Sequence, residues 1–112
     1  MNVSQRNNNP LNLKDRNQAE EVDLDQEGFA RFTTPIAGWR AAHRQIALDQ
    51  GRGLSLEEFI HKFAPPREND SENYLKFVCA ELRVPRIENL RDISKYALAG
   101  VMAQMEGYYS NE

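Results

Sequence analysis

The positions of its five prolines constrain this chain more than any other feature, because a proline limits where a helix can begin or continue. Pro35 suits the first turn of a helix, and the two threonines before it can cap that helix. The pair Pro65 and Pro66 stops a second helix, and Pro85 stops a third. Most of the chain after residue 32 is therefore predicted to be helical, in segments with defined ends.

Apolar residues recur at helical spacing in four segments that these boundaries separate. The first is expected to end at Gly51, a left-handed cap. The second starts at Ser55, whose hydroxyl faces Glu58 in a capping box, and the third starts at Asp70 or Ser71. The residues expected to face the core are Ile36, Trp39, His43 or Ala42, and Ile46 in the first helix; Leu56, Phe59, Ile60 and Phe63 in the second; Tyr74, Phe77, Val78 and Leu82 in the third; and Leu90, Ile93, Ala97, Leu98, Val101, Met102 and Met105 in a fourth helix over residues 89–106.

A short β-hairpin is expected before these helices. Val22 and Leu24 alternate with aspartates, and an aromatic segment follows the turn residues DQEG at positions 25–28. We therefore expect a mainly helical α+β fold, with four helices and the hairpin near the N-terminus. The chain has 112 residues and no internal repeat, which predicts a single domain over residues 1–112 with residues 1–5 flexible.

The charge and hydropathy of the chain exclude several classes of partner. The net charge is −3 and the sequence pI is about 5.4, and no Lys/Arg run exceeds two residues, which predicts no nucleic-acid binding. No apolar run approaches the length of a membrane helix, so we expect no membrane partner. The N-terminus is polar and has no signal-peptide core.

No metal or cofactor is expected from the motifs of this chain. The one cysteine, Cys79, cannot form a disulfide within the chain, and we expect a buried, reduced thiol. His43 and His61 lie on different expected helices, without a Cys or Asp at ligand spacing, so packing or surface roles are favoured over catalysis. A phosphate-binding glycine loop and a Ser-His-Asp elbow are both absent from the sequence.

Asparagines crowd the segment RNNNPLN at residues 6–12. Asn9 precedes a proline and is pushed towards an extended backbone, whereas Asn7, Asn8 and Asn12 tolerate left-handed turn conformations. Primary amides also donate and accept hydrogen bonds together, which suits sugar hydroxyls and N-acetyl groups. The segment predicts a tight turn, a ligand-binding loop, or both.

Glu106 is the candidate catalytic acid. It lies beside the apolar stripe of the last helix, in the final turn, where the helix carbonyls are unsatisfied. Burial and a negative helix end both favour a protonated carboxyl, which a general acid needs to protonate a leaving sugar oxygen. The alternative interpretation is an exposed glutamate near a frayed terminus. Tyr108 and Tyr109 follow the terminator Gly107, and they would line a carbohydrate groove or pack the terminus.

Three motifs follow one another along the chain: R-N-N-N-P-L-N at residues 6–12, G-F-A-R-F-T-T-P-I-A-G-W-R-A at 28–41, and F-A-P-P-R-E-N-D-S at 63–71 followed by Tyr74. In these motifs the chain resembles a family of small phage and prophage proteins with lysozyme-like or transglycosylase-like character. Leu11 stands where that family has glycine, and Met105 stands where its closing H-E-N-G has histidine. The W-x-G segment that usually precedes the hairpin is missing.

The resemblance implies a lysozyme-like domain that cleaves the β-1,4 bond between amino sugars of peptidoglycan, with Glu106 as general acid. A lytic transglycosylase needs no second carboxylate, whereas a hydrolase needs one, for which Glu20, Glu21 and Asp23 are the candidates. The implied substrate-binding residues are Asn7, Asn8, Asn9, Asn12, Tyr108 and Tyr109.

The order of these parts is similar to that in bacterial glucosaminidases, with one difference. Those enzymes place a catalytic glutamate at a helix end, before an asparagine-rich stretch, a hairpin and an A-x-F-x-x-[FY]-x-S segment. Here the helix-end glutamate comes last, so the chain looks like a circularly permuted version of that site. The permutation predicts that Glu106 and residues 7–12 meet around one groove, because chain termini often lie close together.

Two other functions remain open at the level of the sequence. One is a catalytically inactive virion structural or wall-binding protein on the same scaffold, which the replaced glycine at Leu11 and the negative net charge favour. The other is a delivered antibacterial effector. The expected partners are the peptidoglycan glycan strand and other virion proteins. The expected route is synthesis in the bacterial cytoplasm without a signal peptide, followed by virion association or delivery to the periplasm.

Overall fold

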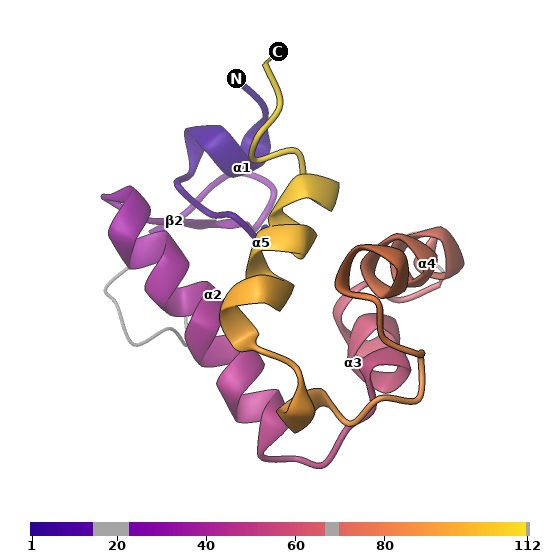
Figure 1. Cartoon of the computed structure of the whole chain (residues 1–112). Helices are drawn as coiled ribbons and strands as arrows, with labels where there is room; N and C mark the ends of the chain where they lie inside the picture. Colours follow the sequence, from indigo (N-terminus) through magenta and orange to yellow (C-terminus); the bar gives the residue numbers. More distant parts are fainter. Residues whose placement is uncertain (15–22, 67–69, 112) are drawn as a thin grey trace. The chain divides into compact units, whose positions relative to one another are not determined.

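A computed structural model describes residues 1–14, 23–66 and 70–111 of the chain (Figure 1). The elements are α1 (Val3–Arg6), β1 (Asp23–Leu24), β2 (Ala30–Arg31), α2 (Pro35–Gln50), α3 (Leu56–Phe63), α4 (Ser71–Leu82), the 3-10 helix η1 (Leu90–Asp92) and α5 (Lys95–Met105). The predicted mainly helical α+β class with a short hairpin is confirmed. Within the described residues, none of the helices is long and apolar enough to cross a membrane.

The chain forms two compact units, which we describe separately. Unit 1 comprises Met1–Gln45 and Met102–Glu112, and unit 2 comprises Ile46–Val101. The single domain expected from the sequence stays a prediction.

The hairpin of unit 1 forms where the sequence places it. Strands β1 and β2 pair antiparallel, with Leu24 opposite Ala30. Asp25 closes the turn, because its Oδ1 accepts hydrogen bonds from the backbone N–H groups of Glu27 and Phe29, both at 2.9 Å. Gly28 completes the turn with a φ of +90°, a conformation that glycine adopts without steric cost.

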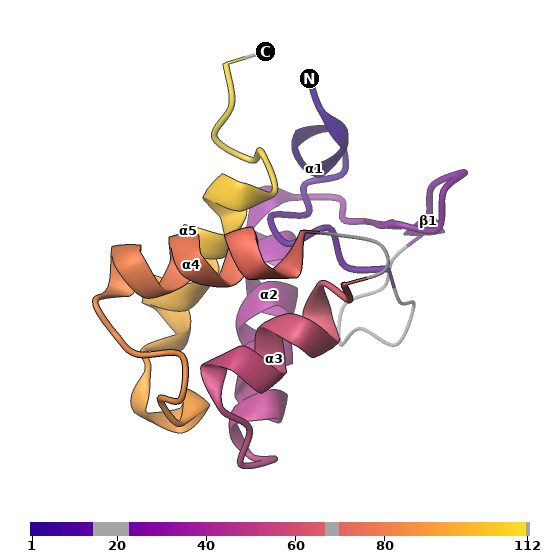
Figure 2. The same cartoon turned by 90° about the vertical axis from the view of Figure 1, so that its right-hand side faces the viewer.

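The short helix α1 of unit 1 was not among the expected elements. Asn2 caps it: the Asn2 side chain accepts from the Gln5 N–H at 3.1 Å, and the Gln5 side chain accepts from the Asn2 N–H at 3.2 Å. Residues 1–5, for which we expected flexibility, include the start of this helix, and their mobility stays a prediction. Figures 1 and 2 both show α1 beside the chain's C-terminal segment, with the two termini close together.

Helix α2 begins as predicted, but its buried face differs from the expected one. The Thr34 hydroxyl accepts from the Ala37 N–H at 3.1 Å and caps the helix. Ile36 is 64% exposed, so placing it in the core was wrong. Four of the buried positions are small residues and one is large; they are Ala37, Gly38, Ala41, Ala42 and Ile46. At Gly38 the reason is the Asn8 backbone, which approaches this helix closely. Gly53, with a φ of +71°, takes the left-handed conformation that we had expected at Gly51.

The last predicted helix is in fact two elements. Ile93 is extended (φ −107°, ψ 132°), which separates η1 from α5. Ser94 then starts α5, since its hydroxyl accepts from the Ala97 N–H at 3.3 Å. Ala97 and Met105 are exposed rather than buried, and the buried residues of α5 are Leu98, Ala99, Met102 and Ala103. Gly107, with a φ of +82°, terminates the helix as predicted.

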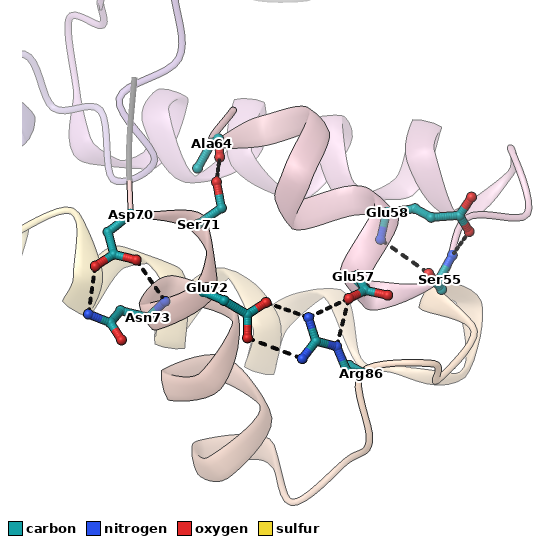
Figure 3. A network of polar contacts seen from close by, with 9 residues as sticks. All are labelled: Ser55, Glu57, Glu58, Ala64, Asp70, Ser71, Glu72, Asn73 and Arg86. Atoms are coloured by element: carbon teal, nitrogen blue, oxygen red, sulfur yellow. Dashed lines mark hydrogen bonds and ion pairs between the residues drawn. The ribbon is translucent and has the colours of Figure 1, made fainter. Parts of the chain in front are cut away.

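The helices of unit 2 start at the predicted caps (Figure 3). Ser55 and Glu58 form the expected capping box of α3, with hydrogen bonds of 2.9 and 3.1 Å. Asp70 caps α4 by accepting from the Asn73 N–H at 3.1 Å. Helices α3 and α4 pack against each other, and the buried apolar residues of this pair are Leu56, Phe59, Ile60, Tyr74, Leu75 and Val78. Leu75 was missing from the predicted face, whereas Phe63, Phe77 and Leu82 are only half-buried.

Ion pairs hold the ends of these helices in unit 2. Arg86 bonds to Glu72 at 2.5 and 3.1 Å and to Glu57 at 2.6 Å, which links the first turns of α3 and α4 (Figure 3). The buried Asp49 at the end of α2 pairs with Lys62 at 2.9 Å and with Arg52 at 2.6 Å. A buried carboxylate needs such partners to offset its lost hydration.

Cys79 differs from its predicted state. Its side chain is half-buried on α4 and it is a free thiol, so the expectation of a fully buried cysteine was wrong while the reduced state stands. Partial burial raises the pKa of the Cys79 thiol above its ordinary value, which favours the unreactive protonated form.

Candidate functional site

The asparagine-rich segment of unit 1 is a turn that binds the hairpin. Asn8 and Asn12 have left-handed backbones, with φ values of +50° and +54°, as the sequence predicted for these residues. The Asn7 backbone carbonyl accepts from the Phe32 N–H at 2.8 Å, and the Asn8 amide donates to the Phe32 carbonyl at 3.0 Å. The turn therefore lies along the residue that directly follows β2.

Asn9 is the central support of this turn. Its side chain is fully buried, and its Nδ2 donates to the backbone carbonyls of Leu13 at 3.0 Å and Ala30 at 2.9 Å. Its Oδ1 accepts from the Leu13 N–H at 3.0 Å. Because all of these partners are protein backbone, Asn9 shapes the loop rather than presenting its amide to a ligand.

Asn7 is also buried, at 1% exposure, and joins the turn to the hairpin. Its Nδ2 donates to Asp25 Oδ2 at 2.9 Å. This hydrogen bond is the main cause that lowers the pKa of the Asp25 carboxyl, and the backbone N–H groups of Phe29 and Glu27 act in the same direction. Asp25 is thus a structural acid that our search for site residues did not single out.

Helix α2 meets the turn at Gly38. A Cβ atom at this position would lie 1.7 Å from the Asn8 carbonyl oxygen and 3.1 Å from Pro10 Cδ. Only glycine fits there, which explains the glycine in the T-P-x-x-G segment. Leu11, which replaces the glycine of the resembling family, is fully buried and does not have a positive φ. It is a core residue, and the strain that we considered at this position is not present.

Glu106 directly follows α5 and contacts the other end of the turn. Asn12 Nδ2 donates to Glu106 Oε1 at 3.0 Å, across 94 residues of sequence. The Glu106 side chain is half-buried, and its backbone N–H donates to the Met102 carbonyl at 3.0 Å. The predicted meeting of Glu106 with the segment 7–12 is therefore present in the structure, through Asn12.

Helix α1 fixes the backbone around Glu106. The Ser4 hydroxyl donates to the Glu106 carbonyl at 3.1 Å, and Asn2 Nδ2 donates to the Gly107 carbonyl at 2.5 Å. Gln5 Nε2 donates to the Tyr108 carbonyl at 3.1 Å and to the Ser110 carbonyl at 2.5 Å. The sequence signal for this role is the spacing of Asn2 and Gln5, which is that of a capping box.

Asn12 retains hydrogen-bonding capacity that the protein does not use. Its Oδ1 is buried and has no partner among the residues that the structure describes, and the same is true of Asn7 Oδ1. Buried acceptors are rarely left without a donor, so such atoms call for an explanation. An amide can also serve a carboxyl in two ways, because it donates to the carboxylate or, turned over, accepts from the carboxylic acid.

The two tyrosines after Glu106 differ in exposure. Tyr108 is half-buried, whereas Tyr109 is 57% exposed. Both contact the indole of Trp39, and Tyr109 borders an open hollow of about 600 Å³ together with Gln104, Gly107 and Ser110. Sequence reasoning had assigned Trp39 to the helix stripe and so missed its place beside the candidate site.

Of the three candidate second carboxylates, the structure describes one. Asp23 lies in β1 and is exposed. Glu20 and Glu21 lie outside the described residues.

One cluster in unit 2 has the composition of a metal site. Ligand atoms of Glu57, His61 and Glu72 lie within 4.8 Å of one another. Arg86, however, donates hydrogen bonds to both carboxylates (Figure 3). Its bond to Glu72 is the main cause that lowers the pKa of that carboxyl. The Arg86 guanidinium already bonds to both acids, so the arrangement is that of an ion-pair network.

Comparison with known proteins gives one relative. The chain is 39% identical over 110 residues to "Protein P5" of Pseudoalteromonas phage PM2, and the match covers 90% of this chain and 68% of the phage protein. No family model matches the chain, and no solved structure matches it.

Proposed function

The chain belongs to the family of Protein P5 of Pseudoalteromonas phage PM2, and on that premise we propose that it is a peptidoglycan-directed phage or prophage protein. It cleaves the β-1,4 glycosidic bond between amino sugars, with Glu106 as general acid. Its partners are the glycan strand and other virion proteins. It is made in the bacterial cytoplasm and acts from the virion or after delivery to the periplasm.

The observation that carries this proposal is the hydrogen bond between Asn12 and Glu106. The similarity to a permuted glucosaminidase site requires that a helix-end glutamate and an asparagine-rich turn lie together, although they stand at opposite ends of the sequence. Helix α1 supports the same arrangement, because Ser4 and Asn2 hold the backbone at Glu106 and Gly107. A carboxyl that one amide orients, on a backbone that other side chains hold, suits a general acid, which must point at one oxygen of the substrate.

In the proposed reaction Glu106 donates its proton to the glycosidic oxygen as the bond to the anomeric carbon breaks. Either a water molecule or the 6-hydroxyl of the same sugar then attacks the anomeric carbon, and the carboxylate takes up the proton that is released. The second route gives an anhydro end and needs no further carboxylate. Asn12 acts as a positioning residue in both steps. Its amide can donate a hydrogen bond to the Glu106 carboxylate and can accept one from the carboxylic acid.

A catalytically inactive virion structural or wall-binding protein is the second candidate. The net charge of −3 favours it, since an anionic wall attracts positively charged enzymes, and so does the methionine in place of histidine at Met105. Such a protein would bind wall glycan or another virion protein without releasing fragments.

Release of muropeptides from purified peptidoglycan, followed by mass spectrometry, tests the proposal. We expect reducing or anhydro ends from the wild type and none from Glu106→Gln. The matched control is Glu81→Gln on α4, where an exposed carboxyl is removed, and this variant should release fragments at the wild-type rate. Equal release by Glu106→Gln and wild type would exclude the mechanism, and no release by the wild type would favour the binding role.

A further inference from the structure

Four aromatic rings of unit 1 form a cluster beside the segment that follows Glu106. The Trp39 indole stacks on the His43 ring at 5.8 Å between centroids and meets the Tyr108 ring edge-on at 5.5 Å. The Tyr109 ring lies 6.4 Å from Trp39 and 5.5 Å from Tyr108. Each ring is thus fixed by at least one other ring in a geometry that aromatic pairs prefer.

The cluster presents one ring to solvent. Tyr109 is 57% exposed although Trp39 and Tyr108 support it from within, and the other three rings are half-buried. A tyrosine that is both exposed and held in place binds a ligand with a small loss of conformational entropy. Exposure alone is common among surface tyrosines, so the surroundings of this ring decide its role.

The space next to Tyr109 is an open hollow whose walls are partly apolar and partly polar. It has a volume of about 600 Å³ and is lined by Gln104, Gly107, Tyr109 and Ser110. A second hollow of about 440 Å³ shares Ser110 with the first and is also lined by Met1, Gln5, Tyr108 and Asn111. The four residues that line the hollow beside Tyr109 are all uncharged, so the ligand that this hollow fits is neutral and amphipathic.

A pyranose ring has this character. Its C–H groups form an apolar face that packs on the electron-rich face of an aromatic ring, and its rim carries hydroxyl and acetamido groups that exchange hydrogen bonds with amides and hydroxyls. The Gln104 amide and the Ser110 hydroxyl lie on the wall of the hollow that Tyr109 borders. Gly107 lines the same hollow and is the residue next to Glu106, so a sugar there would lie near the proposed acid.

We propose that Tyr109, supported by Trp39 and Tyr108, forms a subsite for one uncharged N-acetylated sugar ring. The inference rests on the proposed function, because it takes the ring cluster as the neighbouring subsite of Glu106. It adds Trp39 and Gln104 to the binding residues, and it assigns recognition to the sugar ring rather than to the peptide or the charge of the wall.

Titration with tetra-N-acetylchitotetraose tests this subsite. Trp39 is the one tryptophan of the chain, so intrinsic fluorescence reports on the cluster itself. We expect a saturable change in the Trp39 emission of the wild type and of Glu106→Gln. Because the ligand is uncharged, we also expect the same affinity at low and at high salt.

Variants of the exposed ring separate stacking from folding. Tyr109→Ala should weaken binding about fivefold to tenfold, the amount that one aromatic contact contributes. Tyr109→Phe keeps the ring and should bind like the wild type. The matched control is Tyr96→Ala in unit 2, which removes another exposed tyrosine (64% exposed) and should leave binding unchanged. Circular dichroism of each variant verifies that it is folded.

The outcomes distinguish this inference from the proposed function. Saturable binding that Tyr109→Ala weakens supports the subsite even if the wild type releases no muropeptides. Two results would overturn the subsite and leave the general acid unaffected. One is a wild type that cleaves peptidoglycan but shows no fluorescence change with the sugar. The other is a Tyr109→Ala variant that binds the sugar as tightly as the wild type does.

Discussion

The helix caps of unit 2 join near neighbours, whereas several hydrogen bonds of unit 1 join opposite ends of the chain. In unit 2, Ser55 and Glu58 close the start of α3, and Asp70 closes the start of α4 within three residues. In unit 1, Asn12 and Ser4 reach Glu106 across 94 and 102 residues. The two buried side-chain oxygens without a partner among the described residues, on Asn7 and Asn12, also lie in unit 1.

This difference distinguishes contacts that only stabilise helices from contacts that belong to the proposed site. Local caps and ion pairs stabilise helices whatever the rest of the chain does, and they leave little capacity for a ligand. A buried amide with an unused acceptor costs free energy, and such costs are typically found at functional sites. We therefore place the proposed chemistry in unit 1, and we assign the caps and ion pairs of unit 2 to the support of its own helices.

The largest expected effect is at Gly38, where α2 meets the asparagine turn. Gly38→Ala puts a Cβ atom 1.7 Å from the Asn8 carbonyl oxygen, so backbone must move, and we expect a loss of about 3 kcal/mol or more in the free energy of unfolding. Thermal or denaturant melting measures it. Gly100→Ala is the matched control in α5 of unit 2, where nothing lies within 4 Å, and it should stabilise by about 0.5–1 kcal/mol. Equal melting of both variants would contradict the close contact.

Removal of the Asn9 amide should have the next largest effect. Asn9→Ala leaves the Leu13 N–H and the Leu13 and Ala30 carbonyls with one partner fewer in a buried place, which costs about 2–3 kcal/mol. Denaturant unfolding of this variant and of Asn111→Ala, an exposed control, gives the difference. A loss below about 0.5 kcal/mol would mean that the amide network is not what fixes the turn.

The smallest effect concerns pH and the ion pairs of unit 2. Arg86 lowers the pKa of Glu72, so this pair contributes stability above the unfolded-state pKa of Glu72, about 4.3, that is lost as the pH falls through the lowered value. Both side chains are exposed, so the contribution is small. Melting temperatures from pH 7 to pH 3 should fall less steeply for Glu72→Gln than for the wild type. Glu81→Gln should follow the wild-type curve, and identical curves for all three proteins would show that the pair contributes nothing.

The parts of this fold that could be predicted from the sequence are those with local causes. The caps at Ser55 and Asp70 and the terminator Gly107 depend on side chains within one helical turn, and each lies where the pattern placed it. The buried face of α2 could not be predicted in the same way, because Gly38 is matched to the Asn8 carbonyl, which is distant in sequence. The break at Ile93 was hidden by an apolar spacing that continues through it.

The candidate site could be predicted in part. The order of the motifs predicted that Glu106 meets the asparagine turn, and the structure shows Asn12 as the residue that does so. The different hydrogen-bond partners of Asn7, Asn9 and Asn12 could not be predicted from the sequence. The three side chains are identical, and only the groups around each in the folded chain distinguish them. The capping-box spacing of Asn2 and Gln5 could have predicted α1 itself, but its bonds to the backbone carbonyls of Glu106, Gly107, Tyr108 and Ser110 could not be predicted, because backbone groups carry no sequence signal.

The most direct test of the central claim compares two asparagines of the same turn. Asn12→Ala removes the bond to Glu106, whereas Asn8→Ala removes only a bond to the Phe32 carbonyl. At a temperature where both variants are folded, we expect muropeptide release to fall about tenfold to a hundredfold for Asn12→Ala and to fall less for Asn8→Ala, because the Asn8 side chain is not bonded to Glu106. Equal rates for Asn12→Ala and the wild type would contradict the claim that the turn and the helix end form one site.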